Sequence, residues 1–249
     1  MMLMSADLKL KIGCCGWSYL RPEKNWREKF KSKLQVYASL FDIVEVNSTF
    51  YKLPRLATCE TWFQEAREVN PNFEFVVKAP KAITHEDRFS SQASIEKFEE
   101  IKKICKSLKA EKLLFQTPAS FKPSATNISA VKNFFHSIKR ENLQLIWEVR
   151  GKEWKPEIIR GLFSELDIEH CSDPFATKPI ARKFAYLRLH GSPPGNRMYY
   201  YKYSRKDFEF LKNFVEEMSK NVKEIYIMFN NIYMYEDSIE FMKYLNEKI

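Results

Sequence analysis

The sequence predicts a single (β/α)8 barrel that spans residues 1–249. Strand patterns and helix patterns alternate from one end of the chain to the other, and eight segments have strand character. A chain of 249 residues also has the length that is typical of such barrels. A doubly wound open sheet is the alternative, but the GxGxxG turn that commonly follows its first strand is absent.

The strands and helices can be placed in order along the chain. Apolar residues that alternate with polar ones, or short apolar runs, predict strands at 9–15, 43–47, 73–78, 112–116, 143–150, 169–173, 185–190 and 224–230. Apolar residues at helical spacing predict helices at 27–40, 59–69, 94–108, 129–138, 156–166, 206–218 and 239–245. Ser94 is expected to cap its helix, and Pro156 suits a first helical turn.

Charged and amide side chains share one face of several predicted strands, near the carboxyl ends. In 143–150, Leu145 and Trp147 alternate with Glu148 and Arg150. The corresponding polar residues of three other strands are Glu45 and Asn47, Arg188 and His190, and Asn230. Burying such groups costs several kcal/mol unless they are paired. Because the carboxyl ends of barrel strands form the mouth where sites lie, the sequence predicts a polar pocket there.

The chain is basic, with a net charge of +9 and a pI of about 9.1. A solvated basic surface is the simplest interpretation, and the alternatives are a nucleic-acid partner or an anionic substrate. Lysine and arginine are dispersed among glutamates and form no run of five, which disfavours the nucleic-acid alternative.

Cysteine usage and hydropathy predict an intracellular protein without a membrane span. The five cysteines are scattered and form no CxxC pair, which argues against a disulfide framework or a structural zinc site. No apolar run reaches about 18 residues, and the first residues lack a signal-peptide pattern. A reducing cytoplasm is therefore expected.

Seven sequence blocks, in order, resemble those of the YecE-like family, known as domain of unknown function 72. They are GCCGWSY at 13–19, VEVNSTFYKLP at 44–54, FVVKAPKAITH at 75–85, LLFQTPASF at 113–121, WEVRGKEW at 147–154, YLRLHG at 186–191 and MFNN at 228–231. The resemblance covers nearly the whole chain and implies a TIM-barrel-like fold. It implies no particular reaction, substrate or cofactor.

The catalytic candidates at the mouth are Glu45, Glu148 and His190. A pocket of low dielectric constant separates the pKa values of two carboxyl groups, so one serves as acid and the other as base. Histidine is a natural proton shuttle near neutral pH. We therefore expect an enzyme that uses acid–base chemistry on a small or sugar-like anionic substrate.

Ten further side chains at strand ends and adjacent loops are candidates for substrate binding. The cations among them suit carboxylate or phosphate oxygens, and the aromatic rings suit a sugar or a base. The set is Trp17, Tyr19, Asn47, Lys78, His85, Gln116, Arg150, Arg188, Asn230 and Asn231. Phe50, Tyr51 and Trp154 also follow strands, and packing within loops explains these three rings, Trp17 and Tyr19 equally well.

Several alternatives remain open from the sequence. Glu148 and Arg188 are also consistent with a structural ion pair, and Lys78 with simple neutralisation of Glu45. A metal site built on the carboxylates is disfavoured by the three nearby cations. A nucleic-acid-processing protein, including a metal-dependent phosphoesterase, and a non-catalytic ligand-binding barrel are the competing functions. The loop 191–204, GSPPGNRMYYYKYS, is either a lid over the mouth or a packed aromatic loop.

Overall fold

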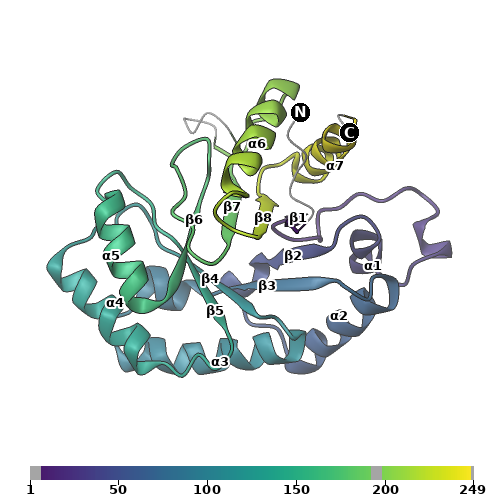
Figure 1. The fold of residues 1–249 in the computed structure, drawn as a ribbon. Coiled ribbons are helices and arrows are strands. Elements are labelled where there is room, and N and C mark those ends of the chain that lie inside the picture. Colours follow the sequence, from purple (N-terminus) through teal and green to yellow (C-terminus); the bar gives the residue numbers. More distant parts are fainter. Residues whose placement is uncertain (1–6, 192–197, 248–249) are drawn as a thin grey trace.

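The computed structural model describes residues 7–191 and 198–247, and its parallel strands close into a barrel (Figure 1). Each strand pairs with its neighbours in the sequence, and the last strand pairs with the first. The strands are β1 (Lys9–Cys14), β2 (Ile43–Val46), β3 (Glu74–Lys78), β4 (Lys112–Gln116), β5 (Gln144–Glu148), β6 (Ile168–Ser172), β7 (Ala185–Leu189) and β8 (Glu224–Phe229). The predicted fold class is confirmed.

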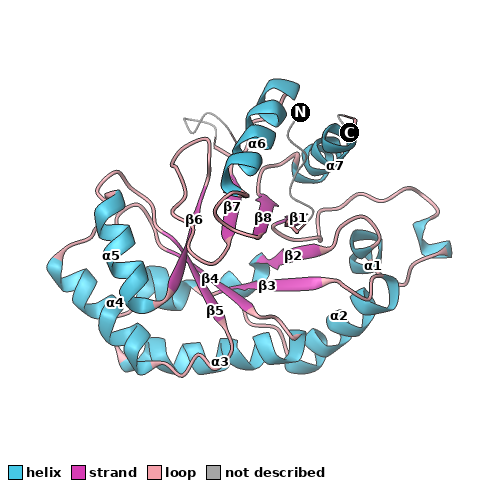
Figure 2. Ribbon diagram, viewed as in Figure 1, coloured by secondary structure: helices cyan, strands magenta, loops and turns pink. Residues whose placement is uncertain are grey.

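Helices follow every strand except β6, which leads directly to β7, and they surround the barrel (Figure 2). They are α1 (Lys33–Ala38), α2 (Leu56–Val69), α3 (Gln92–Leu108), α4 (Ala125–Ser137), α5 (Pro156–Leu166), α6 (Arg205–Met218) and α7 (Met234–Asn246). Three shorter turns are η1 (Trp26–Glu28), η2 (Asn47–Phe50) and η3 (Ala82–Glu86). Across the described residues, every helix is too short or too polar to cross a membrane.

Several helices begin elsewhere than the sequence predicts, α2, α4 and α7 a few residues earlier, and capping residues explain the starts of α1 and α3. Helix α1 is much shorter than 27–40, because the Ser32 side chain caps it by accepting a hydrogen bond from a backbone N–H of its first turn. Helix α3 begins at Gln92 instead of at residue 94, because Ser91 rather than Ser94 is its cap. Ser94 lies inside that helix, and its hydroxyl donates to Asp87 instead.

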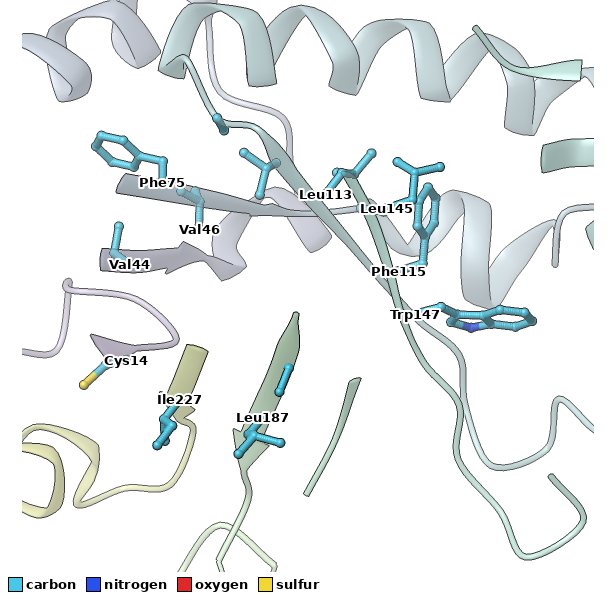
Figure 3. Packing of buried hydrophobic residues seen from close by; sticks show 14 of the residues in the cluster. Cys14, Val44, Val46, Phe75, Leu113, Phe115, Leu145, Trp147, Leu187 and Ile227 are labelled. Atoms are coloured by element: carbon cyan, nitrogen blue, oxygen red, sulfur yellow. The ribbon is translucent and has the colours of Figure 1, made fainter. Parts of the chain in front are cut away.

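The outer faces of the strands are apolar and pack against the helices. Figure 3 shows side chains of this layer, among them Val44, Phe115, Trp147 and Leu187. Complete burial of one such side chain stabilises the fold by about 1.5–3 kcal/mol. A second, smaller apolar cluster occupies the inner faces and includes Ile43, Val76, Leu114, Ile146 and Met228. The charged residues of the mouth follow this inner cluster along the strands.

Gly13 allows β1 to approach β2 closely. A Cβ atom at this position would lie 2.2 Å from the Ile43 carbonyl oxygen, so a larger residue would separate the two strands. Cys15 comes next on the inner side of β1, and its thiol therefore lies close to the charged groups of the mouth.

Candidate active site

Arg188 is the centre of the charged cluster at the mouth. It lies on β7 with a fully buried side chain, and its two terminal nitrogens bind carboxylates from two other strands. Nη2 is 2.9 Å from Oε1 of Glu45 on β2, and Nη1 is 2.5 Å from Oε2 of Glu148 on β5. Two charge-assisted contacts offset the cost of burying the guanidinium group. The structure thus contains the ion pair between Glu148 and Arg188 that the sequence analysis considered.

Glu148 also receives two further donors. Arg150 Nε is 2.7 Å from Oε1, and His190 Nε2 is 3.2 Å from the same oxygen. Burial acts to raise the pKa of Glu148, but the charges of Arg188, His190 and Arg150 hold it well below its usual range. Glu148 is therefore a carboxylate whose oxygens are both occupied by donors from the protein.

Glu45 is buried beneath Arg188 and has a second donor. Tyr186, two residues before Arg188 on the same strand face, donates its hydroxyl to Oε2 of Glu45 at 3.0 Å. The Cys15 sulfur lies 3.7 Å from Arg188 Nη2. Burial and the Glu45 charge raise the pKa of the Cys15 thiol well above its usual value, so this sulfur is neutral and a poor nucleophile.

His190 is held on both sides of its ring. Nε2 contacts Glu148, and Nδ1 lies 3.1 Å from the side-chain nitrogen of Asn230. The backbone N–H of His190 donates to Asp173 Oδ2 at 2.9 Å, which fixes the position of the strand end. The ring also packs edge-on against Tyr199. The imidazole is therefore oriented, and its Nδ1 side is closed by an amide side chain rather than by a charge.

Lys78, at the end of β3, is the buried cation of the mouth that lacks a carboxylate partner among residues 7–191 and 198–247. Its side chain is 6% exposed, and Nζ lies 4.2 Å from the centroid of the Phe50 ring. Burial, reinforced by the Arg188 charge, lowers the pKa of Lys78 to about 8, although Glu45 and Glu148 act in the opposite direction. The simple neutralisation of Glu45 considered from the sequence does not describe this geometry, since Glu45 binds Arg188 and Tyr186 instead.

Three other predicted residues lie around Lys78. The ring of His85 packs edge-on against Phe50, and burial together with the charges of Lys78 and Arg150 lowers its pKa. Gln116 ends β4, is buried and donates to the Thr117 carbonyl. Asn47 follows β2, and its Oδ1 is buried without a hydrogen-bond partner in the described part of the chain. An unsatisfied buried oxygen of this kind is suited to a ligand that donates a hydrogen bond.

A cavity of about 1160 Å³ adjoins the mouth. Its wall combines the loop after β1, the start of α7 and the strand-end residues Cys15, Asn47 and Asn230. Tyr19 lines it and is 82% exposed, so its ring is available to a bound molecule. The predicted role of Tyr19 in binding is therefore compatible with its position.

Some predicted residues have other partners. Trp17 packs edge-on against Trp62 of α2, with ring centroids 5.0 Å apart. Trp154 is buried against Phe121 and Trp147 and belongs to the core. These rings stabilise loops and helices, which is the packing alternative stated above for the aromatic residues.

Asn231 connects the long loop before α6 to α7. Its Nδ2 donates to the Tyr201 carbonyl at 2.8 Å and to Asp237, which in turn accepts from the Tyr203 backbone N–H. Burial raises the pKa of Asp237 to about 6. The loop for which the sequence left open a lid or a packed aromatic loop extends over 191–204, and its residues 192–197 lie outside the described residues. The described end of the loop contributes Tyr199, whose hydroxyl is 3.2 Å from Arg150 Nη2.

Tyr186 and Tyr199 were missed as site residues by the sequence analysis. The signal for Tyr186 was present, because it shares the inner face of β7 with Arg188 and His190. No periodicity marks Tyr199, which reaches the site from a loop. Prediction of such a contact needs the path of the loop in space.

The described residues contain no group of three or more His, Cys, Asp or Glu side chains placed to hold a metal ion. The two central carboxylates, Glu45 and Glu148, face the Arg188 guanidinium instead of each other. This geometry gives no support to the carboxylate metal site considered from the sequence.

The fold and the site define a (β/α)8-barrel protein with a buried, charged cluster at the carboxyl ends of its strands. Residues 11–249 match the model of the family described as "Protein of unknown function DUF72", and the chain belongs to this family. The resemblance stated from the sequence blocks is thereby confirmed.

Relatives agree with this assignment. UPF0759 protein YunF of Bacillus subtilis (strain 168) is 26% identical over 88% of each chain. A DUF72 family protein from Thermotoga maritima MSB8 has a crystal structure with a TM-score of 0.73 and 26% identity, covering 96% of this chain and 99% of that one. A xylose isomerase domain containing protein from Salmonella typhimurium LT2 has a TM-score of 0.62 and 12% identity, covering 99% and 97%. The last likeness concerns the fold alone.

Proposed function

We propose that this chain is an enzyme that transfers protons on a small, sugar-like substrate bearing a carboxylate or a phosphate. The observation that carries the proposal is the row of contacts from His190 through Glu148 to Arg188. A histidine held by a buried carboxylate is oriented for proton transfer.

The three catalytic candidates have different roles in this proposal. His190 exchanges the proton, at Nδ1, after a substrate group replaces the Asn230 amide there. Glu148 orients the ring through its contact with Nε2. Glu45 is completely buried under Arg188, so it acts as a positioning residue that fixes the guanidinium group.

The preference for an anionic substrate follows from side-chain donors at the mouth that are available to a ligand. The oxygens of Glu45 and Glu148 already accept from protein donors. Arg150 is 27% exposed and uses Nε and Nη2, which leaves Nη1 without a partner in the described residues. The ammonium group of Lys78 likewise has donors to spare. A carboxylate or phosphate matches these cationic donors.

The sugar-like character of the substrate rests on the cavity wall. Tyr19, Trp26 and Tyr233 supply rings, and Asn47 and Asn230 supply amides that suit hydroxyl groups. Rings with a few convergent polar groups are typical of sites for small polar ligands. The cavity wall includes Tyr199 and Asn230, whose side chains contact Arg150 and His190 respectively.

Exchange of substrate hydrogen with solvent tests the proposal. The protein is incubated in D2O with a panel of sugar phosphates and sugar acids, and deuterium incorporation is measured by mass spectrometry. Loss of a positioned general base lowers the rate by about 100-fold or more, so His190→Asn is expected to incorporate correspondingly less. His136→Asn is the matched control, since His136 is an exposed residue of α4.

Two results contradict the proposal. Equal incorporation by His190→Asn and wild type would remove His190 from the reaction. Absence of incorporation into every member of the panel, with binding of one of them retained, would favour the non-catalytic ligand-binding barrel.

The nucleic-acid alternative receives less support from the surface. Many helix lysines are paired with glutamates, as in Lys97–Glu100 and Lys132–Glu165. Such pairs reduce the field available to a phosphate backbone. The net charge of +9 is thus better explained as a mixed, solvated surface.

A further inference from the structure

We propose that Nζ of Lys78 is a nucleophile that forms an imine with the carbonyl carbon of an anionic substrate, such as a 2-oxo acid or a keto-sugar phosphate. This inference rests on the proposed function, because it names the substrate class of the same site. It adds a covalent step in which a lysine of the mouth takes part.

The position of Lys78 distinguishes it from an ordinary ion-paired lysine. Its side chain is buried at the end of β3, and the ammonium group lies against the face of Phe50. The nearby carboxylates of Glu45 and Glu148 are engaged by Arg188 and other donors. Packing therefore holds the amine in the mouth, and no counterion of the described chain protects it from a reactant.

The electrostatic surroundings favour the reactive form of the amine. An amine attacks a carbonyl group only when it is unprotonated. Burial and the Arg188 charge bring the pKa of Lys78 to about 8, so a substantial neutral fraction exists at mildly alkaline pH. Lysine amines that form imines in enzymes are activated in this way, by desolvation or by a neighbouring cation.

The chemical step is balanced without an oxidant or a reductant. The Nζ lone pair forms a bond to the carbonyl carbon, and the carbonyl π electrons move to oxygen, which takes a proton. Nitrogen loses a proton, the hydroxyl group gains one and leaves as water, and the C=N bond of the imine remains. The protonated imine withdraws electrons from the adjacent C–H bond, which is the bond from which His190 takes a proton in the proposed function.

Lys112 provides a matched control within the chain. It is buried at the opposite end of the barrel, where Nζ lies 4.6 Å from the centroid of Tyr226. The charges of Glu74 and Glu224 oppose the effect of burial on the pKa of Lys112. Lys112 shares burial and ring contact with Lys78 but lies far from the mouth, so it tests whether burial alone makes a lysine reactive.

Borohydride trapping tests the inference. The full chain is incubated with pyruvate or with dihydroxyacetone phosphate and then treated with sodium borohydride, which converts an imine to a stable secondary amine. Intact mass and peptide mapping locate the adduct. The expected result is saturable labelling at Lys78 in wild type and in Lys112→Arg, and its loss in Lys78→Arg, which keeps a charge. Thermal unfolding of each variant confirms that it is folded.

The outcomes separate this inference from the proposed function. Labelling of Lys78 no greater than that of the exposed Lys52, with either compound, overturns the imine. Deuterium incorporation retained by Lys78→Arg also overturns the imine while leaving proton transfer by His190 intact. Labelling of Lys78 that persists in His190→Asn, together with unchanged deuterium incorporation there, supports the imine and contradicts the proposed role of His190.

Discussion

Among residues 7–191 and 198–247, each end of the barrel contains one buried lysine, and the two lysines differ in their surroundings. Lys78 at the mouth is 6% exposed, and Lys112 at the opposite end is 4% exposed. After burial, the largest influence on the pKa of Lys78 is the Arg188 charge, which lowers it further. The largest such influence on Lys112 is the Glu74 charge, which raises it. Similar burial is thus combined with a neighbouring positive charge at Lys78 and with a neighbouring negative charge at Lys112.

The carboxylates explain this difference. At the lower end, Glu74 is partly exposed and lies 2.9 Å from Lys9 and 3.0 Å from Lys11, so it belongs to a solvated network. At the mouth, Glu45 and Glu148 are buried and bind Arg188. The mouth therefore depends on internal pairing, and this pairing leaves Lys78 without a counterion in the described structure. Conditions of this kind are typical of functional sites.

The largest expected effect is on the Arg188 network. Arg188→Met leaves two buried carboxylates without their shared partner, and loss of one member of a buried pair costs about 3–5 kcal/mol. Denaturant unfolding measures the change in the free energy of unfolding. Arg205→Met is the control, because Arg205 and Glu247 form an exposed pair for which about 0–1 kcal/mol is expected. Similar losses in both variants would mean that the mouth is no more dependent on pairing than the surface.

The next-largest expected effect is an increase in the free energy of unfolding. Lys78→Met replaces a buried cation that lacks a counterion by an apolar side chain of similar length. A pKa of about 8 instead of 10.5 corresponds to a cost of charging in the folded state, so the variant is expected to gain about 1–3 kcal/mol of unfolding free energy. Lys112→Met should gain less, since it leaves Glu74 and Glu224 with less positive charge nearby.

The gain from Lys78→Met should also depend on pH. Between about pH 8 and 10.5 the folded wild type binds fewer protons at Lys78 than the unfolded chain, so this group makes stability rise with pH. The destabilisation of the folded state by the charged Lys78 is complete below pH 8 and disappears toward pH 10.5. The difference between variant and wild type, measured by denaturant unfolding across this range, should therefore shrink as pH rises. A constant difference would show that packing, rather than charge, distinguishes the two proteins.

The sequence predicted the mouth well where a residue lies on a strand. Glu45, Glu148, Arg188 and His190 converge because alternation places them on the inner face near the carboxyl ends. The barrel itself followed from the count and order of strands. Within a strand, the position of a residue in the sequence determines the face on which its side chain lies, and for that reason these residues could be predicted.

Residues on loops have contacts that the sequence did not indicate. Trp17 follows a strand but packs on Trp62, and Asn231 follows Asn230 but holds the Tyr201 carbonyl. Partners of this kind depend on the three-dimensional path of loops and on helices distant in the sequence. Pairing inside the cluster was also hidden, since the sequence alone does not show that Arg188 binds both Glu45 and Glu148.

The smallest expected effect lies at the lower end of the barrel. Glu74→Gln removes the carboxylate shared by Lys9 and Lys11, but these side chains reach solvent, and Lys9 keeps Glu224 at 3.8 Å. Exposed or partly exposed pairs contribute about 0.2–1 kcal/mol, so a loss in this range is expected in denaturant unfolding. Glu68→Gln, which removes the exposed Lys31 pair, is the control and should lose no more than Glu74→Gln. A loss as large as that of Arg188→Met would show that both ends rely equally on buried charge, and Lys78 would then owe its properties to burial rather than to the mouth.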